Sequence, residues 1–314
     1  MLTHLLRVSD LNQADIVRTL ELADAFKKAP DRSARLLAGK SVTIHFAKPS
    51  TRTRISFETA VHRLGGLPIT VGPTDLQMGH SETVEDTARV ISRMSAAFVT
   101  RTFKDDDLQK FAGAASIPVI NALTDGHHPC QALADLMTLR ERFQRLEGLT
   151  LAYVGAGNNV AHSLLEACAL TGVHIRVATP NAFACYPAVV SHAEGLAKKT
   201  GAKITITDDA KEAVDGADCI YTDTWLSMGD PPVERAARLA ALGPYQVNAR
   251  LFARAKKTAL FMHCLPAHRG QEVTNDIADS SASVIFDQAE NRLHTSLAIL
   301  ELGLTQRFEG SQGV

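Results

Sequence analysis

The sequence predicts an α/β protein built from two doubly wound parallel-sheet domains with a cleft between them. Apolar, β-rich segments alternate with amphipathic helical segments, which is typical of parallel sheets covered by helices on both faces. The same alternation occurs in both halves of the chain. The 314 residues are enough for two domains that each bury a core of their own.

The order of the expected elements follows from this alternation. In the first half we expect strands at 41–46, 67–71, 96–100 and 118–122, and helices at 10–28, 55–64, 82–94, 105–114 and 128–143. In the second half we expect strands at 149–154, 173–180, 203–207, 219–225, 258–264 and 283–287, and a final helix at 289–304. We place the first domain at residues 1–137, the second at 138–296, and a C-terminal helix that packs back on the first domain at 297–314.

The composition is that of an ordinary globular protein, with 45% hydrophobic and 21% charged residues. The net charge of −1 gives no overall field that would attract nucleic acid or an acidic membrane, so anion binding has to come from local clusters. The five cysteines are odd in number and form no C-x-x-C pattern, which favours a reducing compartment. No signal peptide or membrane-spanning run is recognisable, so we expect a cytoplasmic protein.

A polar cluster at 50–54, Ser-Thr-Arg-Thr-Arg, lies at the turn between the strand at 41–46 and the helix at 55–64. The first N–H groups of a helix are unpaired and carry partial positive charge, and Arg52 and Arg54 add planar groups suited to two phosphate oxygens. The simpler interpretation is that the serine only caps the helix and the arginines face solvent. Five consecutive polar residues exceed what a cap requires, so the cluster predicts a phosphate site.

Two further strand ends in the first half carry polar or cationic side chains. Arg101 follows the strand at 96–100, and the segment 127–131, His-His-Pro-Cys-Gln, follows the strand at 118–122. The carboxyl ends of parallel strands meet at one edge of a sheet, where open α/β folds bind ligands. These side chains are therefore expected to meet the 50–54 cluster.

The second half opens with a strand followed by Gly155-Ala156-Gly157, a weak likeness to a dinucleotide-binding turn. The third glycine of that motif is replaced by Val160, and no acidic residue ends the next strand. Tight packing between strand and helix is the favoured explanation of the glycines. The two asparagines that follow either cap the next helix or hold a substrate carboxylate.

Two later strand ends are rich in chemically active side chains, at 221–229 and at 261–270. The second contains His263, Cys264 and His268, which leaves several interpretations open: a metal site, a nucleophilic thiol, a buried inert thiol, or a thiol that orients a substrate amine. The metal site is disfavoured because no carboxylate stands at the expected spacing. Arg292, at the start of the last helix, is a further candidate to face an anion.

Four motifs together carry a resemblance to a known family. In chain order they are Ser50-Thr51-Arg52-Thr53-Arg54, His128-Pro129-Cys130-Gln131, Asp223-Thr224-Trp225-Leu226-Ser227-Met228-Gly229 and His263-Cys264-Leu265-Pro266. They resemble the motifs of the aspartate/ornithine carbamoyltransferase family, the first two marking carbamoyltransferases in general and the last two the ornithine branch. The resemblance covers nearly the whole chain.

The resemblance implies a site for carbamoyl phosphate. The residues implied to bind it are Ser50, Thr51, Arg52, Thr53, Gln77, Arg101, His128, Gln131, Cys264, Leu265 and Arg292. Residues 50–53 and Arg292 would hold the phosphate, whereas Arg101, His128 and Gln131 would hold the carbamoyl end. Gln77 matches a position that, in the family, reaches into the neighbouring subunit's site.

The resemblance also implies a site for L-ornithine and the reaction that joins the two substrates. The residues implied to bind ornithine are Asn159, Asp223, Ser227 and Met228, and those implied in catalysis are Arg101, His128, Cys264 and Asp223. The expected products are L-citrulline and phosphate, in arginine metabolism. The family uses no metal or organic cofactor and forms trimers or multiples of trimers. The segment 225–229 contains a glycine and is a candidate loop to close over ornithine.

Rival functions remain at this stage. Within the family, the amine could be putrescine or an acylated ornithine, although the Ser-Met-Gly segment and Asp223 favour ornithine. Aspartate would call for additional cations in the second domain. Outside it, the chain could be an inactive carbamoyl phosphate-binding relative or a dehydrogenase. The direction of the reaction in the cell, synthesis or breakdown of arginine, is left open by the sequence.

Overall fold

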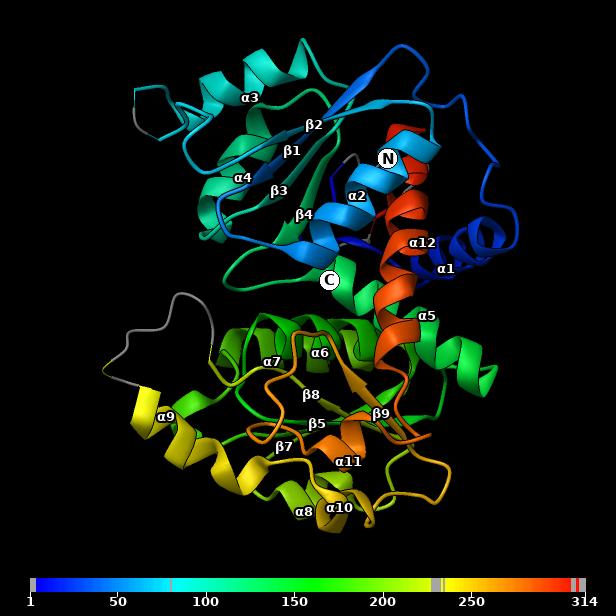
Figure 1. Ribbon diagram of the computed structural model, residues 1–314, viewed down its shortest axis with the longest axis vertical. Coiled ribbons are helices and arrows are strands. Elements are labelled where there is room, and N and C mark those ends of the chain that lie inside the picture. The colour runs from blue at the N-terminus through cyan, green and yellow to red at the C-terminus, as the bar shows by residue number, and fades with distance from the viewer. Residues whose placement is uncertain (1–3, 80, 227–232, 234, 306–308, 311–314) are drawn as a thin grey trace. The chain divides into compact units, whose positions relative to one another are not determined.

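The computed structural model describes residues 4–79, 81–226, 233, 235–305 and 309–310 (Figure 1). The chain divides into two compact units: unit 1 contains residues 1–137 and 290–314, and unit 2 contains residues 138–289. The two divisions fall inside helices, one within α5 and the other within α12. Each unit is described by itself below.

Unit 1 contains a sheet of four parallel strands in its described part, in the order β2-β1-β3-β4. Its elements are η1 (Val8–Asp10), α1 (Gln13–Lys28), β1 (Ser41–Phe46), α2 (Thr51–Arg63), β2 (Leu67–Val71), α3 (Val84–Ser92), β3 (Phe98–Arg101), α4 (Asp105–Ala114) and β4 (Val119–Leu123), followed by the start of α5 (Pro129–Phe143). The strands β1, β3 and β4 are almost entirely buried, as expected for a parallel sheet packed on both faces.

Unit 2 contains five parallel strands in its described part, in the order β7-β6-β5-β8-β9. Its elements after α5 are β5 (Thr150–Val154), α6 (Asn159–Thr171), β6 (His174–Ala178), η2 (Asn181–Phe183), α7 (Pro187–Ala197), β7 (Ile204–Thr207), α8 (Ala210–Val214), β8 (Cys219–Thr222), α9 (Arg235–Leu242), η4 (Gly243–Tyr245), α10 (Ala249–Phe252), β9 (Leu260–His263), α11 (Asn275–Ala278) and the start of α12 (Ile285–Leu304). The prediction of two parallel-sheet α/β domains is thereby confirmed.

The predicted strand at 283–287 is wrong. Only Ser283 forms an isolated bridge, to Phe261, and helix α12 begins two residues later at Ile285. The run Ser-Val-Ile-Phe is short and apolar, a pattern that a buried helix start and a buried strand share. Val284 and Ile285 are 3% and 2% exposed, so the burial that suggested a strand is real but belongs to the entry of a helix.

Both strand orders reverse direction at a defined point, which positions the loops of interest. In unit 1 the chain runs from β1 outward to β2 and then returns to β3 on the other side of β1. In unit 2 the same reversal separates β6 and β7 from β8 and β9, with β5 at the centre. Ligands of open α/β sheets bind beyond the carboxyl ends of the strands that flank such a reversal. Ligand-binding residues are therefore expected in the loops after β1 and β3, and in those after β5 and β8.

The glycine-rich turn after β5 is explained by close packing. A Cβ atom on Gly157 would lie 2.3 Å from the backbone nitrogen of Cys185, and the Gly157 N–H donates to the Phe183 carbonyl at 2.7 Å. Val160, at the third position of the dinucleotide pattern, is 3% exposed in α6. The turn thus allows the segment after η2 to pass directly over the start of α6, which agrees with the packing interpretation of the sequence.

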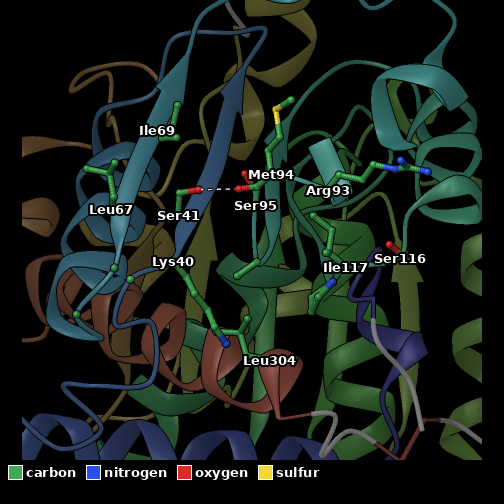
Figure 2. Close-up of a pocket in the computed structure, with 16 residues that line it drawn as sticks. Lys40, Ser41, Leu67, Ile69, Arg93, Met94, Ser95, Ser116, Ile117 and Leu304 are labelled. Atoms are coloured by element: carbon green, nitrogen blue, oxygen red, sulfur yellow. Dashed lines mark hydrogen bonds between the residues drawn. The ribbon is translucent and has the colours of Figure 1, made fainter. Parts of the chain in front are cut away.

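A cavity of about 940 Å³ in unit 1 lies at the opposite end of the sheet (Figure 2). Its lining includes Ser41 and Leu67, the first residues of β1 and β2, and Pro118, which precedes β4. These are the amino-terminal ends of the strands, whereas the 50–54 cluster follows the carboxyl end of β1. The cavity is therefore separate from the predicted phosphate site.

Among the described residues, no helix combines the length and the apolar composition that crossing a membrane requires.

Candidate functional site

Four segments of unit 1 contribute residues to the region beyond the carboxyl ends of its strands. Residues 50–53 form the start of α2, Arg101 ends β3, His128 and Gln131 lie at the start of α5, and Arg292 lies on α12. We call this set the arginine cluster; its members are Ser50, Thr51, Arg52, Thr53, Arg101, His128, Gln131 and Arg292. The α/β alternation placed the first three segments at one edge of the sheet, and the structure does so too.

Arg292 is the member that ties the cluster together. Its guanidinium is 2% exposed and donates to the Gln131 side-chain oxygen at 2.5 Å and to the Thr53 hydroxyl at 3.0 Å. These contacts join the starts of α2 and α5 to α12. The Gln131 side-chain nitrogen donates in turn to the carboxylate of Asp135, which is fully buried one turn further along α5. Arg292, which the sequence suggested as a residue that faces an anion, therefore lies among the other members of the cluster.

Ser50 and Arg101 form a second contact within the cluster. Ser50 is the N-cap residue of α2, yet its side chain makes no capping hydrogen bond; its hydroxyl instead lies 3.5 Å from an Arg101 guanidinium nitrogen. The interpretation of the serine as a simple helix cap is not supported by this arrangement. The backbone N–H groups at the start of α2 and the hydroxyl groups of residues 50, 51 and 53 are donors suited to an anion.

His128 is the only imidazole in the arginine cluster, and it is 5% exposed. Burial holds the pKa of His128 well below its ordinary value of 6.5, and three neighbouring guanidinium groups lower it further. In order of effect they are Arg292, Arg101 and Arg52. The imidazole is therefore neutral near pH 7 and can donate one hydrogen bond without adding charge.

Arg54 does not belong to the cluster, although the sequence suggested that it would help to bind phosphate. Its side chain is 57% exposed and its Nε donates to Glu58 at 2.9 Å, one helical turn away. The reason is helical geometry, since residues two apart on a helix point to different sides. Arg52 and Arg54 therefore cannot both face the same anion from α2.

Gln77 lies on the exposed loop between β2 and α3. Its side-chain oxygen accepts a hydrogen bond from Ser81 at 3.0 Å, within the same loop. The structure describes this chain without neighbours, so the expected reach of Gln77 into another subunit stays a prediction. Thr51, at the first position of α2, is also exposed.

In unit 2 the loops after β5, β8 and β9 converge on Asp223. This carboxylate is 7% exposed and accepts three hydrogen bonds, from the Asn158 side chain at 2.7 Å, the Thr224 N–H at 2.7 Å and the Cys264 thiol at 2.8 Å. Asn158 also caps α6 by accepting from the N–H groups of Val160 and Ala161. We call Asn158, Asp223 and Cys264 the aspartate cluster.

The other three residues expected to bind ornithine are Asn159, Ser227 and Met228. Asn159 is the first residue of α6 and is partly exposed, next to the cap residue Asn158. Ser227 and Met228 lie outside the described residues, as does the glycine that follows them. Leu265 adjoins Cys264, is partly buried and has a φ of 59°.

A metal site at this place is not favoured by the bonding of the residues present. Ligand atoms of Asp223, His263 and Cys264 lie within 4.8 Å of one another. However, the His263 Nδ1 accepts the Leu265 N–H at 2.8 Å and its Nε2 lies 3.3 Å from Glu272. Both ring nitrogens are thus occupied by protein partners. The other His of the motif, His268, bonds through Nδ1 to the Thr224 hydroxyl at 2.8 Å.

Two buried acids that support these clusters were not predicted from the sequence. Asp135 holds Gln131 from within α5, and Glu272 lies behind the loop that carries Cys264. The spacing of Gln131 and Asp135, four residues apart on an otherwise apolar helix face, is a signal that could have been used. Glu272 follows a Gly-Gln turn and has no such signal.

Comparisons with known proteins agree with the two-unit description. Residues 3–141 match the family model described as the carbamoyl-P binding domain of aspartate/ornithine carbamoyltransferase, and residues 147–302 match the model of its Asp/Orn binding domain. The ornithine carbamoyltransferase of Acidothermus cellulolyticus is 49% identical over 302 residues, which cover 96% of each chain.

Solved structures give the same result. The ornithine carbamoyltransferase from Pyrococcus furiosus is 46% identical with a TM-score of 0.92, covering 95% of this chain and 96% of that one. The anabolic ornithine carbamoyltransferase from Campylobacter jejuni is 36% identical with a TM-score of 0.91, covering 98% of this chain and 100% of that one.

Because the pKa of His128 is lowered, we expect this residue to make the folded protein less stable at acidic pH. Below pH 6.5 the unfolded chain binds a proton at this residue that the folded chain does not yet bind, so stability falls as the pH falls through this window. A single group contributes at most about 1.4 kcal/mol per pH unit. We expect His128→Asn to flatten the decline of the unfolding temperature between pH 7 and pH 5. Equal slopes for the variant and the wild type would contradict the assignment of a depressed pKa.

Proposed function

The chain belongs to the aspartate/ornithine carbamoyltransferase family, and from this premise we propose that it transfers the carbamoyl group of carbamoyl phosphate to the δ-amino group of L-ornithine. The products are L-citrulline and phosphate. The observation that carries the proposal is the arginine cluster of unit 1, in which three guanidinium groups act on a buried, uncharged imidazole. This combination suits a small ligand with a phosphate at one end and a polar carbonyl group at the other.

In the proposed complex, the start of α2 binds the phosphate. Residues 50–53 supply backbone N–H groups, hydroxyl groups and the Arg52 guanidinium, and Arg292 completes the pocket from α12. The positive end of the helix dipole and the planar guanidinium groups both favour a phosphate with two negative charges. The contacts of Arg292 with Gln131 and Thr53 support this role, because they hold the guanidinium at the start of α2 before any ligand binds.

The carbamoyl end is proposed to bind Arg101, His128 and Gln131. Attack on the carbamoyl carbon places negative charge on its oxygen, so donors fixed around that oxygen stabilise the transition state. A neutral His128 donates an N–H to the oxygen and needs no change of protonation state during the reaction. Arg101 supplies the positive charge in the same place. Residues with fixed positions are effective here because they do not need to reorganise as the charge develops.

The aspartate cluster of unit 2 is proposed to bind ornithine. Asp223 offers a nearly buried carboxylate to the amino acid's ammonium group, and Asn159, Ser227 and Met228 are assigned to the remainder of its amino-acid end. Cys264 and Leu265 are assigned to the region where the δ-amine meets the carbamoyl group. The hydrogen bond from the Cys264 thiol to Asp223 supports a common role for these two residues.

The δ-amine has to be uncharged before it can attack, and an alkyl amine of this kind has a pKa of about 10. Only a small fraction of free ornithine is therefore reactive at neutral pH. Transfer of the carbamoyl group then needs the amine in contact with the carbamoyl carbon and correctly oriented. Such positioning is worth about 7–11 kcal/mol of the barrier in well-oriented systems. Asp223 and Cys264 contribute by orienting the amine.

We further propose that the chain works as a homotrimer or a multiple of trimers, with Gln77 completing the site of a neighbouring subunit. Strand β2 is an edge strand of unit 1, and its Leu67 and Ile69 are 62% and 41% exposed. Both line the cavity of Figure 2 together with Met94, which is 74% exposed. Apolar groups gathered at an open sheet edge support burial against another copy of the chain.

The cellular setting is proposed to be the cytoplasm and the synthesis of arginine. None of the five cysteines forms a disulfide, and four of them are buried, which supports a reducing compartment. The relative from Campylobacter jejuni is described as anabolic, and this supports the direction toward citrulline.

Replacement of Arg52 tests the phosphate assignment, and Arg54 provides a matched control two residues along the same helix. Arg52→Gln removes a guanidinium that faces the arginine cluster and should weaken carbamoyl phosphate binding on the order of a hundredfold. Arg54→Gln removes an exposed guanidinium paired with Glu58 and should leave the affinity within about twofold of wild type. Calorimetric titration with carbamoyl phosphate measures both values. Wild-type affinity for carbamoyl phosphate in Arg52→Gln would contradict the assignment of the phosphate site to this cluster.

Replacement of Ile69 tests the assembly, with Ile206 as the control. Both isoleucines are 41% exposed and lie on edge strands, Ile69 on β2 of unit 1 and Ile206 on β7 of unit 2. Ile69→Glu would place an unpaired charge in the proposed interface at a cost of a few kcal/mol, roughly 3–5. We expect light scattering to show dissociation of Ile69→Glu and an unchanged trimer mass for Ile206→Glu. A monomeric wild type, or a fully assembled Ile69→Glu variant, would contradict the assignment.

A further inference from the structure

Glu272 is a buried carboxylate with no role in the substrate sites described above. Its side chain is fully buried. The backbone on which it stands is fixed, since the Val247 N–H donates to the Glu272 carbonyl at 2.9 Å and the Thr274 N–H donates to the Val247 carbonyl at 3.1 Å. The carboxylate is therefore held on a rigid support behind the loop that follows β9.

One oxygen of this carboxylate binds both ends of that loop. Glu272 Oε1 accepts the backbone N–H of His268 and lies 3.3 Å from Nε2 of His263. The other His263 nitrogen, Nδ1, accepts the Leu265 N–H at 2.8 Å, so it has to be unprotonated. The proton of the neutral imidazole is therefore on Nε2, which donates to Glu272. Glu272 thus fixes the tautomer of His263, and His263 fixes the backbone at Leu265.

The loop held in this way carries the thiol of the aspartate cluster. Cys264 stands between His263 and Leu265, and its Sγ donates to Asp223 at 2.8 Å. Leu265 has a φ of 59°, a left-handed conformation that costs a residue with a branched side chain about 1–2 kcal/mol. Such a conformation persists only where neighbouring bonds enforce it. One such bond is the Leu265 N–H donating to His263, whose other ring nitrogen contacts Glu272.

The far end of the loop is joined to the same cluster. His268, whose N–H binds Glu272, also contacts the Thr224 hydroxyl through Nδ1 at 2.8 Å, and Thr224 follows Asp223 directly. The loop after β9 and the loop after β8 are thus linked at two places, one at Cys264 and one at His268. Glu272 contacts both ends of the first loop.

We propose that Glu272 is a positioning residue for the amine site: through His263 and the His268 backbone it holds the Cys264 thiol against Asp223. The inference deepens the proposed function, on which its kinetic part rests. Glu272 is assigned no contact with either substrate. Its effect is to keep Cys264 and Leu265 in place for the attack of the amine.

Two variants separate this role from simple stabilisation of the fold. Glu272→Gln keeps an oxygen at the Oε1 position and can accept both hydrogen bonds, so kcat/KM for ornithine should stay within about threefold of wild type. Glu272→Ala removes the acceptor, and kcat/KM for ornithine should fall on the order of tenfold to a hundredfold. The affinity for carbamoyl phosphate, which is assigned to unit 1, should stay within about twofold in both.

A second measurement needs no substrate and no turnover. Cys264 is the only partly exposed cysteine, the other four being buried, so its reaction with iodoacetamide can be followed by mass spectrometry. In the wild type the Cys264 thiol is held by its hydrogen bond to Asp223, so release of the loop should speed alkylation by roughly tenfold in Glu272→Ala and leave it near wild type in Glu272→Gln. This readout holds even if the wild-type protein turns out to use another amine.

Glu166→Ala is the matched control. Glu166 is a second buried carboxylate of unit 2, 1% exposed on α6, and it lies 3.7 Å from His192, away from the loop after β9. It should lower stability without changing Cys264 alkylation or the kinetic constants for ornithine. If Glu272→Ala does not fold, Glu272→Asp replaces it in the comparison with Glu272→Gln. The aspartate side chain is one methylene shorter, so its carboxylate is withdrawn from His263 and His268. The proposal would be overturned if the alkylation rate of Cys264 were unchanged in the Ala or Asp variant. It would also be overturned if kcat/KM for ornithine fell as far in Glu272→Gln as in Glu272→Ala.

Discussion

The reversal of strand order in each sheet is the constraint on which both clusters depend. In a parallel sheet the loops on either side of such a reversal leave in opposite directions, so the space beyond the strand ends is left open for side chains and ligands. In unit 1 the reversal lies between β1 and β3, and in unit 2 between β5 and β8. This arrangement places the start of α2 and Arg101 beyond the strand ends of unit 1. It places the start of α6 and Asp223 beyond those of unit 2.

The two clusters carry opposite charge. The arginine cluster concentrates positive charge, and burial among these groups keeps His128 uncharged, so the site can attract a dianion while still offering a neutral donor. The aspartate cluster presents a nearly buried carboxylate whose oxygens are already held by Asn158, Thr224 and Cys264. Behind each cluster lies a buried carboxylate: Asp135 accepts a hydrogen bond from Gln131, and Glu272 contacts His263, the residue before Cys264.

Much of the fold and the place where the arginine cluster gathers could be predicted from the sequence. The turn at 50–54 was found because a polar run interrupts an apolar strand and helix, which is a local signal. Arg54 was misplaced because its helical phase was not applied, although Glu58 four residues later pointed to an exposed ion pair. The helix start at Ile285 was read as a strand because short apolar runs fit both structures.

Other features have no local signal at all. The contacts of Arg292 with Gln131 and Thr53 span 161 and 239 residues of sequence, so no periodic pattern encodes them. The position of Arg292 near the start of the last helix suggested that it faces an anion, but it did not identify these two partners. Glu272 is a single acid in a polar turn, and its importance depends on the imidazole tautomer that the fold imposes nine residues earlier. Pairings of this kind are properties of the folded chain.

The formation of citrulline from carbamoyl phosphate, with L-ornithine, putrescine and N-acetylornithine compared side by side near pH 8, tests the account most directly. An alkaline pH raises the fraction of uncharged amine in each case, so the comparison reports the amine site. The account predicts turnover with ornithine and none with the other two amines. Turnover with putrescine or N-acetylornithine in place of ornithine, or the absence of turnover from folded protein with all three, would contradict it.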